Sequence, residues 1–428
     1  MAPRPGSVGR KSPPVPGGEC VSDQLSGGGS GSLVTVLVVT YEPDPRLLRE
    51  CLESVVSSDY RPLEVVVVDN GSGRPGVRAE VEQILRGEPE LSLVFSAQER
   101  NLGYAAATNV GFELGHGELV LPLNPDARLA GDAIRLLVEA AGRRSGAAGF
   151  APKVLLANPG VVIDSVGMAL HPGSEGSQRG LGQVDAGQYD LEEQVPGLCF
   201  AAALIRREAW ARVGSLDARY FMFYEDVDWS LRAEVTGESF WTVPAARVFH
   251  FHSASTRHLG GAFKTRLIQR NLIWTAVKNL EPRGASRVLL RRSAANLKRA
   301  RRPQYATASL RAVLEAWVGL PGMIRSRQEI QRRRRRRDVE FLSGRGEATF
   351  FDAEKYRPEA SVAALLAVLS RLYAVAPEPA LESTLLRVQS AEATGVSRDR
   401  ARVAAMVRSG GMELGPGLDW LLGQLESG

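Results

Sequence analysis

The sequence has few cysteines and lacks any long apolar run. Its three cysteines, Cys20, Cys51 and Cys199, are too few and too scattered for a disulfide framework or a zinc site, and they favour a reducing cytoplasm. The first residues lack the apolar core of a signal peptide, and no stretch contains 18 consecutive apolar residues. The closest approach, residues 360–376, is interrupted by Arg371 and is typical of an amphipathic helix. We therefore expect a protein that neither crosses a membrane nor carries an export signal.

Acidic residues are scarce in one segment. The 428 residues have a formal net charge of only +5. Residues 281–338, however, contain 17 Lys and Arg against 4 Asp and Glu, a net of +13 that leaves −8 for the rest. Apolar residues make up 44% and charged residues 24%, as in ordinary globular proteins. The length exceeds one typical hydrophobic core, so we expect one large domain with appendages, or two domains.

Regular apolar periodicity begins only after a polar start. Residues 1–32 are rich in Pro, Gly and Ser, and we expect them to form a disordered N-terminal tail. Four apolar runs of strand length then alternate with helical periods. The strands are expected at 33–40, 63–69, 91–96 and 119–123, and the helices at 44–57, 77–85, 104–114 and 130–141. This alternation predicts an α/β fold with a parallel sheet covered by helices on both faces.

The remainder of the chain is less regular. We expect helices at 206–213 and 226–234, a short strand at 240–243 and a surface loop at 172–187 near any site. The expected organisation is a tail at 1–32, a main domain at 33–280, a basic amphipathic helical segment at 281–338 and a small helical appendage at 339–428. The appendage shows no residues that suggest chemistry.

Two acids directly follow apolar strands. Asp126 closes the turn Asn124-Pro125-Asp126, and Asp69 ends the run at 63–69. Ligands of open α/β sheets bind at the carboxyl ends of the strands, so Asp126 is placed to hold a metal ion against a phosphate. Asp69 is placed to accept hydrogen bonds from a base or a ribose. Both are also common turn residues, and that alternative stays open.

Small residues gather at the start of the helix expected at 104–114. Asn101 and Gly103 precede this helix, Ala105 lies in its first turn, and Asn109 lies near its middle. They would allow a diphosphate to approach the helix amides, or simply allow tight packing of the helix on the sheet. Neither a Gly-x-Gly-x-x-Gly motif after the first strands nor a P-loop motif is present, which argues against a dinucleotide fold and a P-loop enzyme.

Acids, aromatics and histidines cluster later in the chain. Glu225, Asp226 and Asp228 follow the aromatic-rich residues 221–224. Aromatic neighbours desolvate a carboxylate and raise its pKa toward the range of a general base, although Asp226 could instead cap a helix. His250 and His252 lie two apart on an extended segment, so both could face one site. We expect at least one of them to be a ligand.

Taken in order, these motifs resemble those of a family 2 glycosyltransferase of the GT-A fold, and most of all its rhamnosyltransferase-like branch. The resemblance covers about residues 33–280. The motifs are Thr40-Tyr41, Val68-Asp69-Asn70-Gly71-Ser72, Asn101-x-Gly103-x-Ala105 with Asn109 and Gly111, Leu123-Asn124-Pro125-Asp126, Tyr224-Glu225-Asp226-Val227-Asp228, and His250 with Ser255. The resemblance implies a nucleotide-diphospho-sugar transferase fold, with a Rossmann-like mixed sheet between helices and a C-terminal helical extension.

The resemblance also implies a role for each site residue. Asp226 is the implied catalytic base, supported by Glu225 and Asp228, and Asp126 and His250 are implied to hold Mg²⁺ or Mn²⁺. The implied donor-binding residues are Thr40, Tyr41, Glu42, Asp69, Asn70, Asn101, Gly103, Asn109 and Asn124. Arg270-Asn271 and Lys278-Asn279 match the closing helix of the family and are expected to help bind anionic groups.

The implied activity is that of a metal-dependent, inverting hexosyltransferase. It would move a sugar, rhamnose-like by the branch, from a nucleoside-diphosphate sugar to a hydroxyl of a glycan or polyprenyl-linked acceptor in cell-envelope polysaccharide synthesis. A non-catalytic nucleotide-sugar or glycan-binding relative is the alternative. The presence of Asp69, Asp126, Asp226 and His250 favours the enzyme.

Two departures from the family pattern concern the site. Asn124 replaces the first acid of the family's Asp-x-Asp element, which leaves Asp126 as the only charged ligand from that turn. Residues 200–203 lack the glycine that relatives place before the paired arginines, here Arg206 and Arg207. Because that segment often borders the acceptor, we expect a different acceptor pocket.

The basic segment suggests a partner of its own. Six arginines at 332–337 follow residues 309–324, whose apolar face includes Trp317. A basic amphipathic helix can lie on an anionic membrane, although such runs are often only solvated. Nucleic acid is not expected, because aromatic residues do not interleave with the arginines. We expect a cytoplasmic protein whose residues 309–338 allow peripheral contact with the inner face of the cytoplasmic membrane.

Overall fold

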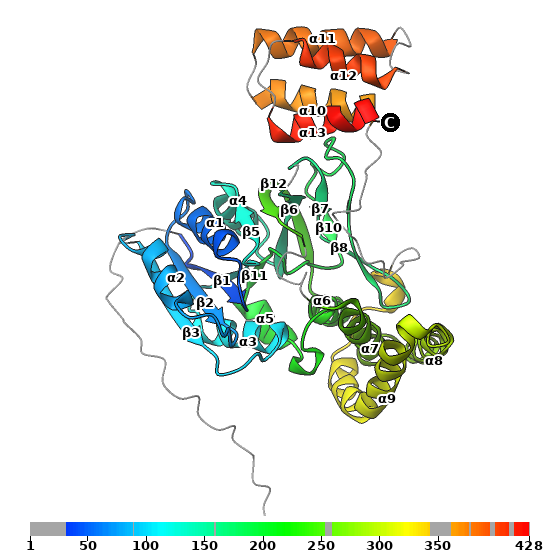
Figure 1. The fold of residues 1–428 in the computed structure, drawn as a ribbon. Coiled ribbons are helices and arrows are strands. Elements are labelled where there is room, and N and C mark those ends of the chain that lie inside the picture. The colour runs from blue at the N-terminus through cyan, green and yellow to red at the C-terminus, as the bar shows by residue number, and fades with distance from the viewer. Residues whose placement is uncertain are drawn as a thin grey trace, which may run out of the picture.

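The computed structural model describes residues 31–88, 90–157, 160–252, 259–342, 361–375, 378–393, 399–410 and 415–427. Nearly all of the tail expected at 1–32 lies outside these ranges, as does Ser255 of the last motif. Strands and helices alternate from β1 to β4, the chain then contains the consecutive strands β6 to β11, and the described residues are helical from α7 onward (Figure 1). The strands are β1 (Val34–Thr40), β2 (Leu63–Asp69), β3 (Leu91–Ala97), β4 (Leu119–Pro122), β5 (Ala127–Leu129), β6 (Gly149–Leu156), β7 (Ile163–Ser165), β8 (Met168–Leu170), β9 (Gly176–Gln178), β10 (Gln194–Val195), β11 (Leu204–Arg206) and β12 (Phe240–His250). The helices are α1 (Pro45–Val56), α2 (Val77–Leu85), α3 (Tyr104–Leu114), α4 (Ala133–Arg143), α5 (Arg207–Val213), α6 (Glu225–Thr236), α7 (Gly261–Asn279), α8 (Pro282–Arg299), α9 (Pro303–Arg332), α10 (Val362–Val375), α11 (Pro379–Ala393), α12 (Arg400–Arg408) and α13 (Pro416–Ser427).

A mixed sheet forms the centre of the main domain. In the described chain its strands follow the order β10-β12-β6-β11-β4-β1-β2-β3, with β5 paired to β12 and β7 to β6. β1 is parallel to β2 and β4, and β2 is parallel to β3. β11 runs antiparallel between β4 and β6. The parallel sheet predicted for the first four strands is confirmed, and so is the mixed sheet between helices.

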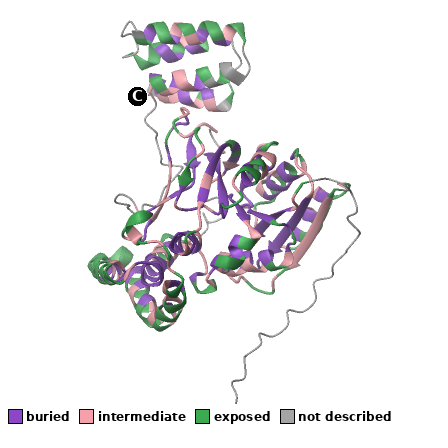
Figure 2. Ribbon diagram, turned by 180° about the vertical axis from the view of Figure 1, so that it is seen from behind, coloured by how far each residue is buried: buried purple, intermediate pink, exposed green. Residues whose placement is uncertain are grey.

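Alternate side chains of each central strand enter two different cores. In β1, Val36 and Val38 pack in a core shared with α1, α2 and α4. Leu37 and Val39 point to the opposite face and pack in a core shared with α3, α5 and α6. The central strands are therefore buried on both faces, while the edge strand β3 is only partly buried (Figure 2).

β12 is longer than the sequence suggested. The strand expected at 240–243 stops before Pro244, whereas β12 continues to His250 because its pairing with β6 resumes at Arg247. Pro244 lies in the irregularity between the two paired stretches, where a missing N–H costs no ladder bond. The continued strand pairs His250 with Ala127 of β5, immediately after Asp126.

The arginine run ends a helix and then becomes part of the fold. α9 stops at Arg332, and the chain then passes α6, where the Arg335 N–H donates to the carbonyl of Val235 (2.8 Å). The Arg334 guanidinium pairs with Asp338 at 3.0 Å, and that of Arg336 pairs with Glu234 at 2.5 Å. These contacts attach the segment after α9 to α6 and to Asp338, while Arg332, Arg333, Arg335 and Arg337 keep exposed side chains.

Two helical groups follow the sheet. α7, α8 and α9 pack on one another, with Trp274 of α7 donating from its indole to the carbonyl of Ala316 in α9 (3.0 Å). α10 to α13 share an apolar core that includes Leu365, Val388 and Leu421. Within the described ranges, no helix has both the length and the apolarity needed to cross a bilayer.

Candidate active site

A cavity of about 850 Å³ lies at the carboxyl ends of β1 and β4. This is the edge of the sheet at which the sequence predicted a ligand. The predicted residues that line it are Thr40, Tyr41, Glu42, Asn70, Asn101, Gly103, Asn124, Asp126, Glu225, Asp226 and His250. Three other predicted residues, Asp69, Asn109 and Asp228, do not line it. The structure thus brings most of the predicted site into one cavity from segments far apart in the sequence.

The ends of β1 and β2 shape one wall of the cavity. The amide of Asn70 donates to Asn101 Oδ1 (3.1 Å), and Asn70 Oδ1 accepts from the Leu102 N–H (2.9 Å). Asp69 accepts from the hydroxyl of Ser72 at 2.5 Å, which is the turn that the sequence offered as its alternative role. The Thr40 hydroxyl is buried without a hydrogen-bond partner among the described residues. An unsatisfied buried hydroxyl at the cavity wall fits a site that receives a polar ligand.

Gly103 and Asn109 serve packing around the site. A Cβ on Gly103, whose φ is +83°, would lie 2.4 Å from the carbonyl oxygen of Phe221. That carbonyl accepts from the Ala105 N–H at 3.1 Å, so the small residues admit the segment before α6. Asn109 binds the backbone of Leu216, donating at 2.8 Å and accepting at 2.9 Å. The tight-packing alternative therefore describes both residues, although Gly103 also lines the cavity.

The segment before α6 has an unusual backbone. Three of its residues adopt the positive φ that side chains disfavour. They are Phe221 (+66°), Phe223 (+67°) and Tyr224 (+72°). The buried Asn271 amide of α7 donates to three carbonyls of residues 220–223, at 2.7 to 3.1 Å. Arg270 donates to the carbonyl of Tyr220 at 2.9 Å. These two residues, expected to bind anionic groups, instead hold the segment that leads into the acid cluster.

Asp226 and Glu225 occupy the first turn of α6. Tyr224 is the N-cap residue, so Asp226 is not the helix cap that the sequence allowed. Burial raises the pKa of Asp226 to about 6. Burial and the charge of Asp226 together raise the pKa of Glu225 well above its ordinary value. A carboxylate with a pKa near 6 on the cavity wall has the basicity that a general base needs at neutral pH.

Asp228 is fully buried and lies outside the cavity lining. It accepts from Arg232 (3.0 Å), Lys278 (2.9 Å) and Asn279 (2.9 Å). Burial alone would raise its pKa, but the charges of Lys278 and Arg232 outweigh burial and hold the pKa below its ordinary value. Lys278 and Asn279, which were expected to help bind anionic groups, therefore bind a carboxylate of the protein itself.

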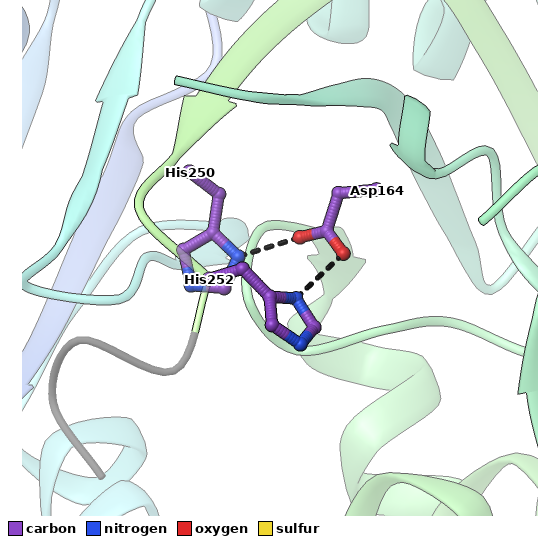
Figure 3. Close-up of side chains that lie close together, drawn as sticks. All are labelled: Asp164, His250 and His252. Atoms are coloured by element: carbon purple, nitrogen blue, oxygen red, sulfur yellow. Dashed lines mark hydrogen bonds and ion pairs between the residues drawn. The ribbon is translucent and has the colours of Figure 1, made fainter. Parts of the chain in front are cut away.

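His250 lies between two carboxylates. Its Nε2 is 3.3 Å from Asp126 Oδ1, and its Nδ1 is 2.6 Å from Asp164 Oδ2. The other oxygen of Asp164 is 2.8 Å from Nδ1 of His252 (Figure 3). Burial would lower the pKa of His250, but the charges of Asp126 and Asp164 outweigh it and raise the pKa to about 10. The fully buried Asp164 thus contacts both predicted histidines, and His250 presents Nε2 to Asp126.

The donor set fits a divalent cation. Adjacent ligands of one ion, each about 2.1 Å from it, lie about 3 Å apart, which is close to the 3.3 Å between Asp126 Oδ1 and His250 Nε2. Asp164, His250 and His252 also bring potential ligand atoms within 4.8 Å of one another. The 2.6 Å contact of Asp164 with His250 is too short for two ligands of one ion, so it is a hydrogen bond. Carboxylate oxygen suits Mg²⁺ and Mn²⁺, and His250 would bind through Nε2 once a metal ion displaces the proton that the two carboxylates stabilise on the imidazole.

Sequence reasoning missed Asp164. It lies in the three-residue strand β7, in the segment Val162-Ile163-Asp164-Ser165, which matches none of the recognised motifs. The only local signal is a single acid within an apolar stretch, where an unpaired carboxylate would be costly. Its partners lie 86 and 88 residues further along the chain, so the pairing exists only once the fold is formed.

Comparison with known proteins identifies the family. The profile described as Glycosyl transferase family 2 matches residues 35–214. An N-acetylglucosaminyltransferase of Bradyrhizobium sp. (strain ANU 289) is 34% identical over 105 residues, which make up 24% of this chain and 67% of that protein. The chain belongs to glycosyl transferase family 2. An N-acetylglucosaminyl-diphospho-decaprenol L-rhamnosyltransferase of Mycobacterium tuberculosis is 29% identical over 245 residues, covering 52% of this chain and 78% of that protein.

Solved structures show distant similarity to this glycosyltransferase. GalNAc-T7 with UDP, GalNAc and Mn²⁺ matches with a TM-score of 0.47 at 14% identity, over 59% of this chain and 48% of that chain. A mannosyltransferase of Pyrobaculum calidifontis with GDP-Man and Mn²⁺ matches with a TM-score of 0.43 at 18% identity, over 68% of this chain and 87% of that chain. This chain thus spans about half the length of the GalNAc-T7 chain.

Proposed function

We propose that this family 2 glycosyltransferase is an inverting enzyme. It moves a sugar, rhamnose-like, from a nucleoside-diphosphate sugar to a hydroxyl of a glycan or lipid-linked acceptor in cell-envelope polysaccharide synthesis. The observation that carries the proposal is one cavity that is lined both by the Asp126–His250 pair and by the partly exposed carboxylate of Asp226. The rhamnosyltransferase named for a decaprenol-linked acceptor supports the choice of donor and acceptor.

The chemistry needs one displacement. The acceptor oxygen forms a bond to the anomeric carbon as the bond to the diphosphate oxygen breaks on the opposite face, and the configuration inverts. The acceptor proton passes to Asp226, whose raised pKa allows it to take up that proton. Asp126 and His250 would hold Mg²⁺ or Mn²⁺, which when bound neutralises charge on the leaving diphosphate. Thr40, Asn70 and Asn101 line the wall proposed to receive the nucleotide.

The acceptor side of the cavity involves residues that the family motifs do not include. Gly176, Ser177 and Gln178 of β9 line the cavity together with Phe200 and Ala201. Residues 200–203 depart from the family pattern, so we propose that this wall sets acceptor choice. We further propose that a lipid-linked acceptor is met at the inner face of the cytoplasmic membrane.

A donor screen separates the enzyme from a non-catalytic binder. The full chain is screened by thermal shift against a panel of nucleotide-sugars with Mn²⁺. The donor that stabilises it is then incubated with a lipid-linked N-acetylglucosamine acceptor, and glycosylated product is measured by mass spectrometry. An enzyme forms product and releases nucleoside diphosphate. Stabilisation by a donor with neither transfer nor hydrolysis would favour the binding protein and overturn the proposal.

A further inference from the structure

The solvent-facing side of α9 is apolar where a surface helix is normally polar. Its outward residues recur at positions i, i+4, i+7 and i+11, which places them on one stripe. They are Leu310, Leu314, Trp317 and Pro321, with Val318 beside them. None of these five residues belongs to a hydrophobic core of the described chain. Leu310, Leu314, Trp317 and Val318 expose between 45% and 73% of their surface.

The stripe continues onto α8. The indole N–H of Trp317 donates to the Ser293 hydroxyl of α8 at 3.1 Å. Leu290 and Leu297 are three residues before and four residues after Ser293, so they lie on the same side of α8. Their exposed fractions are 62% and 51%. Together these residues form one apolar patch across two helices, here called the α8–α9 face.

Cations surround this face, and acids are absent from it. Residues 282–314 contain nine Lys and Arg and no Asp or Glu. Eight of the nine are exposed and form no ion pair with a described residue: Arg283, Arg287, Arg291, Lys298, Arg299, Arg301, Arg302 and Arg311. The next acid, Glu315, is paired with Arg266 and Arg270 of α7, each at 3.3 Å. The face therefore presents apolar side chains within a cationic rim.

We propose that the α8–α9 face docks on an anionic lipid surface. Aliphatic and indole side chains enter the interface between headgroups and acyl chains, while Arg and Lys at the rim bind lipid phosphates. A second copy of this chain fits poorly, because a self-complementary contact would bring two unpaired cationic rims together. The arginines at 332–337 lie outside this face, and three of them pair with acids within the fold: Arg334 with Asp338, Arg336 with Glu234 and Arg337 with Glu281.

The docking face is connected to the cavity through α7. α9 packs along α7 through Trp274, and Phe263 and Ile268 of α7 line the cavity. Docking would thus hold the cavity close to the membrane, where the proposed lipid-linked acceptor resides. The benefit for the acceptor rests on the proposed function, whereas the docking itself does not.

The test uses the full chain and flotation with vesicles. Phosphatidylcholine vesicles with and without phosphatidylglycerol are compared. We expect binding to the anionic vesicles and a fall of about tenfold or more in the bound-to-free ratio for Leu314→Glu/Val318→Glu. Arg287→Glu/Arg291→Glu should weaken binding to anionic vesicles to a similar extent. Leu191→Glu, at a leucine that is 81% exposed and lies outside the face, is the control and should change the ratio by less than about twofold.

Several outcomes would overturn the docking proposal. The first is that Leu314→Glu/Val318→Glu floats with anionic vesicles as wild type does. The second is that Arg332→Glu/Arg335→Glu, which changes the charge as much as Arg287→Glu/Arg291→Glu, lowers the bound-to-free ratio equally or more. The third is that the wild-type protein does not bind vesicles but forms a dimer that Leu314→Glu dissociates. Circular dichroism and thermal unfolding verify that each variant is folded. Transfer to a water-soluble acceptor separates the two proposals: vesicle binding without any transfer would contradict the proposed function and leave the docking face standing.

Discussion

At the scale of single residues, two acids in the same helix have opposite environments. Asp226 faces the cavity, and burial raises its pKa. Asp228, two residues later, is held in ionised form by Lys278 and Arg232. A carboxyl group whose pKa is raised toward neutral pH can exchange a proton there, whereas one that is held ionised cannot. Asp226 therefore remains the proposed proton acceptor, whereas Asp228 contacts Arg232, Lys278 and Asn279 and does not line the cavity.

The pH dependence of transfer follows from Asp226. Its pKa of about 6 lies above the ordinary value, so the carboxyl keeps its proton to a higher pH and acts as a base only once ionised. We expect kcat/KM to be flat above about pH 7 and to fall by about tenfold per pH unit below about pH 6. Initial rates between pH 4.5 and 8.5 measure this profile, with circular dichroism to verify folding at each pH. A flat profile across this range would show that no group of this pKa is needed.

Asp164 is expected to act on the metal through His250. Removing the carboxylate that fixes a ligating imidazole typically lowers metal affinity by about 10- to 100-fold. Asp164→Asn should therefore weaken Mn²⁺ binding to the protein by about that factor, measured by electron paramagnetic resonance of free Mn²⁺ without substrate.

Glu64→Gln provides the matched control for Asp164→Asn. Glu64 is also buried and contacts a histidine Nδ1, that of His116, at 2.7 Å, but it does not line the cavity. Its replacement should leave Mn²⁺ affinity unchanged. Equal losses in the two variants would mean that Asp164 matters only for folding.

At the scale of elements, Asp228 joins α6 to α7. It binds Arg232 within α6 and both Lys278 and Asn279 of α7. Asp228→Ala leaves the buried Arg232 without a carboxylate and Lys278 with Asp217 alone (2.8 Å), so the free energy of unfolding should fall by about 3 kcal/mol. Urea unfolding measures the change. The exposed pair of Asp59 with Arg135 gives a control, because Asp59→Ala should cost less than about 1 kcal/mol. A similarly small loss of unfolding free energy for Asp228→Ala would contradict the role of Asp228 in joining α6 to α7.

The same elements show what local sequence could predict. The expected helices at 77–85 and 104–114 coincide with α2 and α3, and the expected strand at 63–69 coincides with β2. Each has an uninterrupted apolar pattern bounded by turn residues, so local information suffices. β12 extends beyond the strand predicted at 240–243, because its pairing with β6 resumes at Arg247 after the irregularity that contains Pro244. Tertiary pairing decides such cases, and local propensity does not.

At the scale of the whole molecule, the predicted motifs converge because their strands end at one edge of the sheet. Thr40, Asn70, Asp126 and His250 reach the cavity from β1, β2, β4 and β12. Strand order predicted the position of Asp126 at this edge, and the family resemblance implied that the other motifs meet it there. Neither was enough for Asn109, whose partner Leu216 lies 107 residues away, or for Asn271, which supports the segment before α6. Those contacts depend on how α3 and α7 pack, which no local pattern encodes.

The most direct test of the account is Asp226→Asn in the purified full chain. Donor affinity is measured by isothermal titration calorimetry with Mn²⁺, and transfer is measured under saturating donor and acceptor. We predict a donor dissociation constant within about threefold of wild type and a transfer rate lower by about three orders of magnitude, since only the proton acceptor is lost. Asp59→Asn, at an exposed surface pair, should match wild type in both. Transfer by Asp226→Asn within about tenfold of the wild-type rate would contradict the assignment of Asp226 as the base.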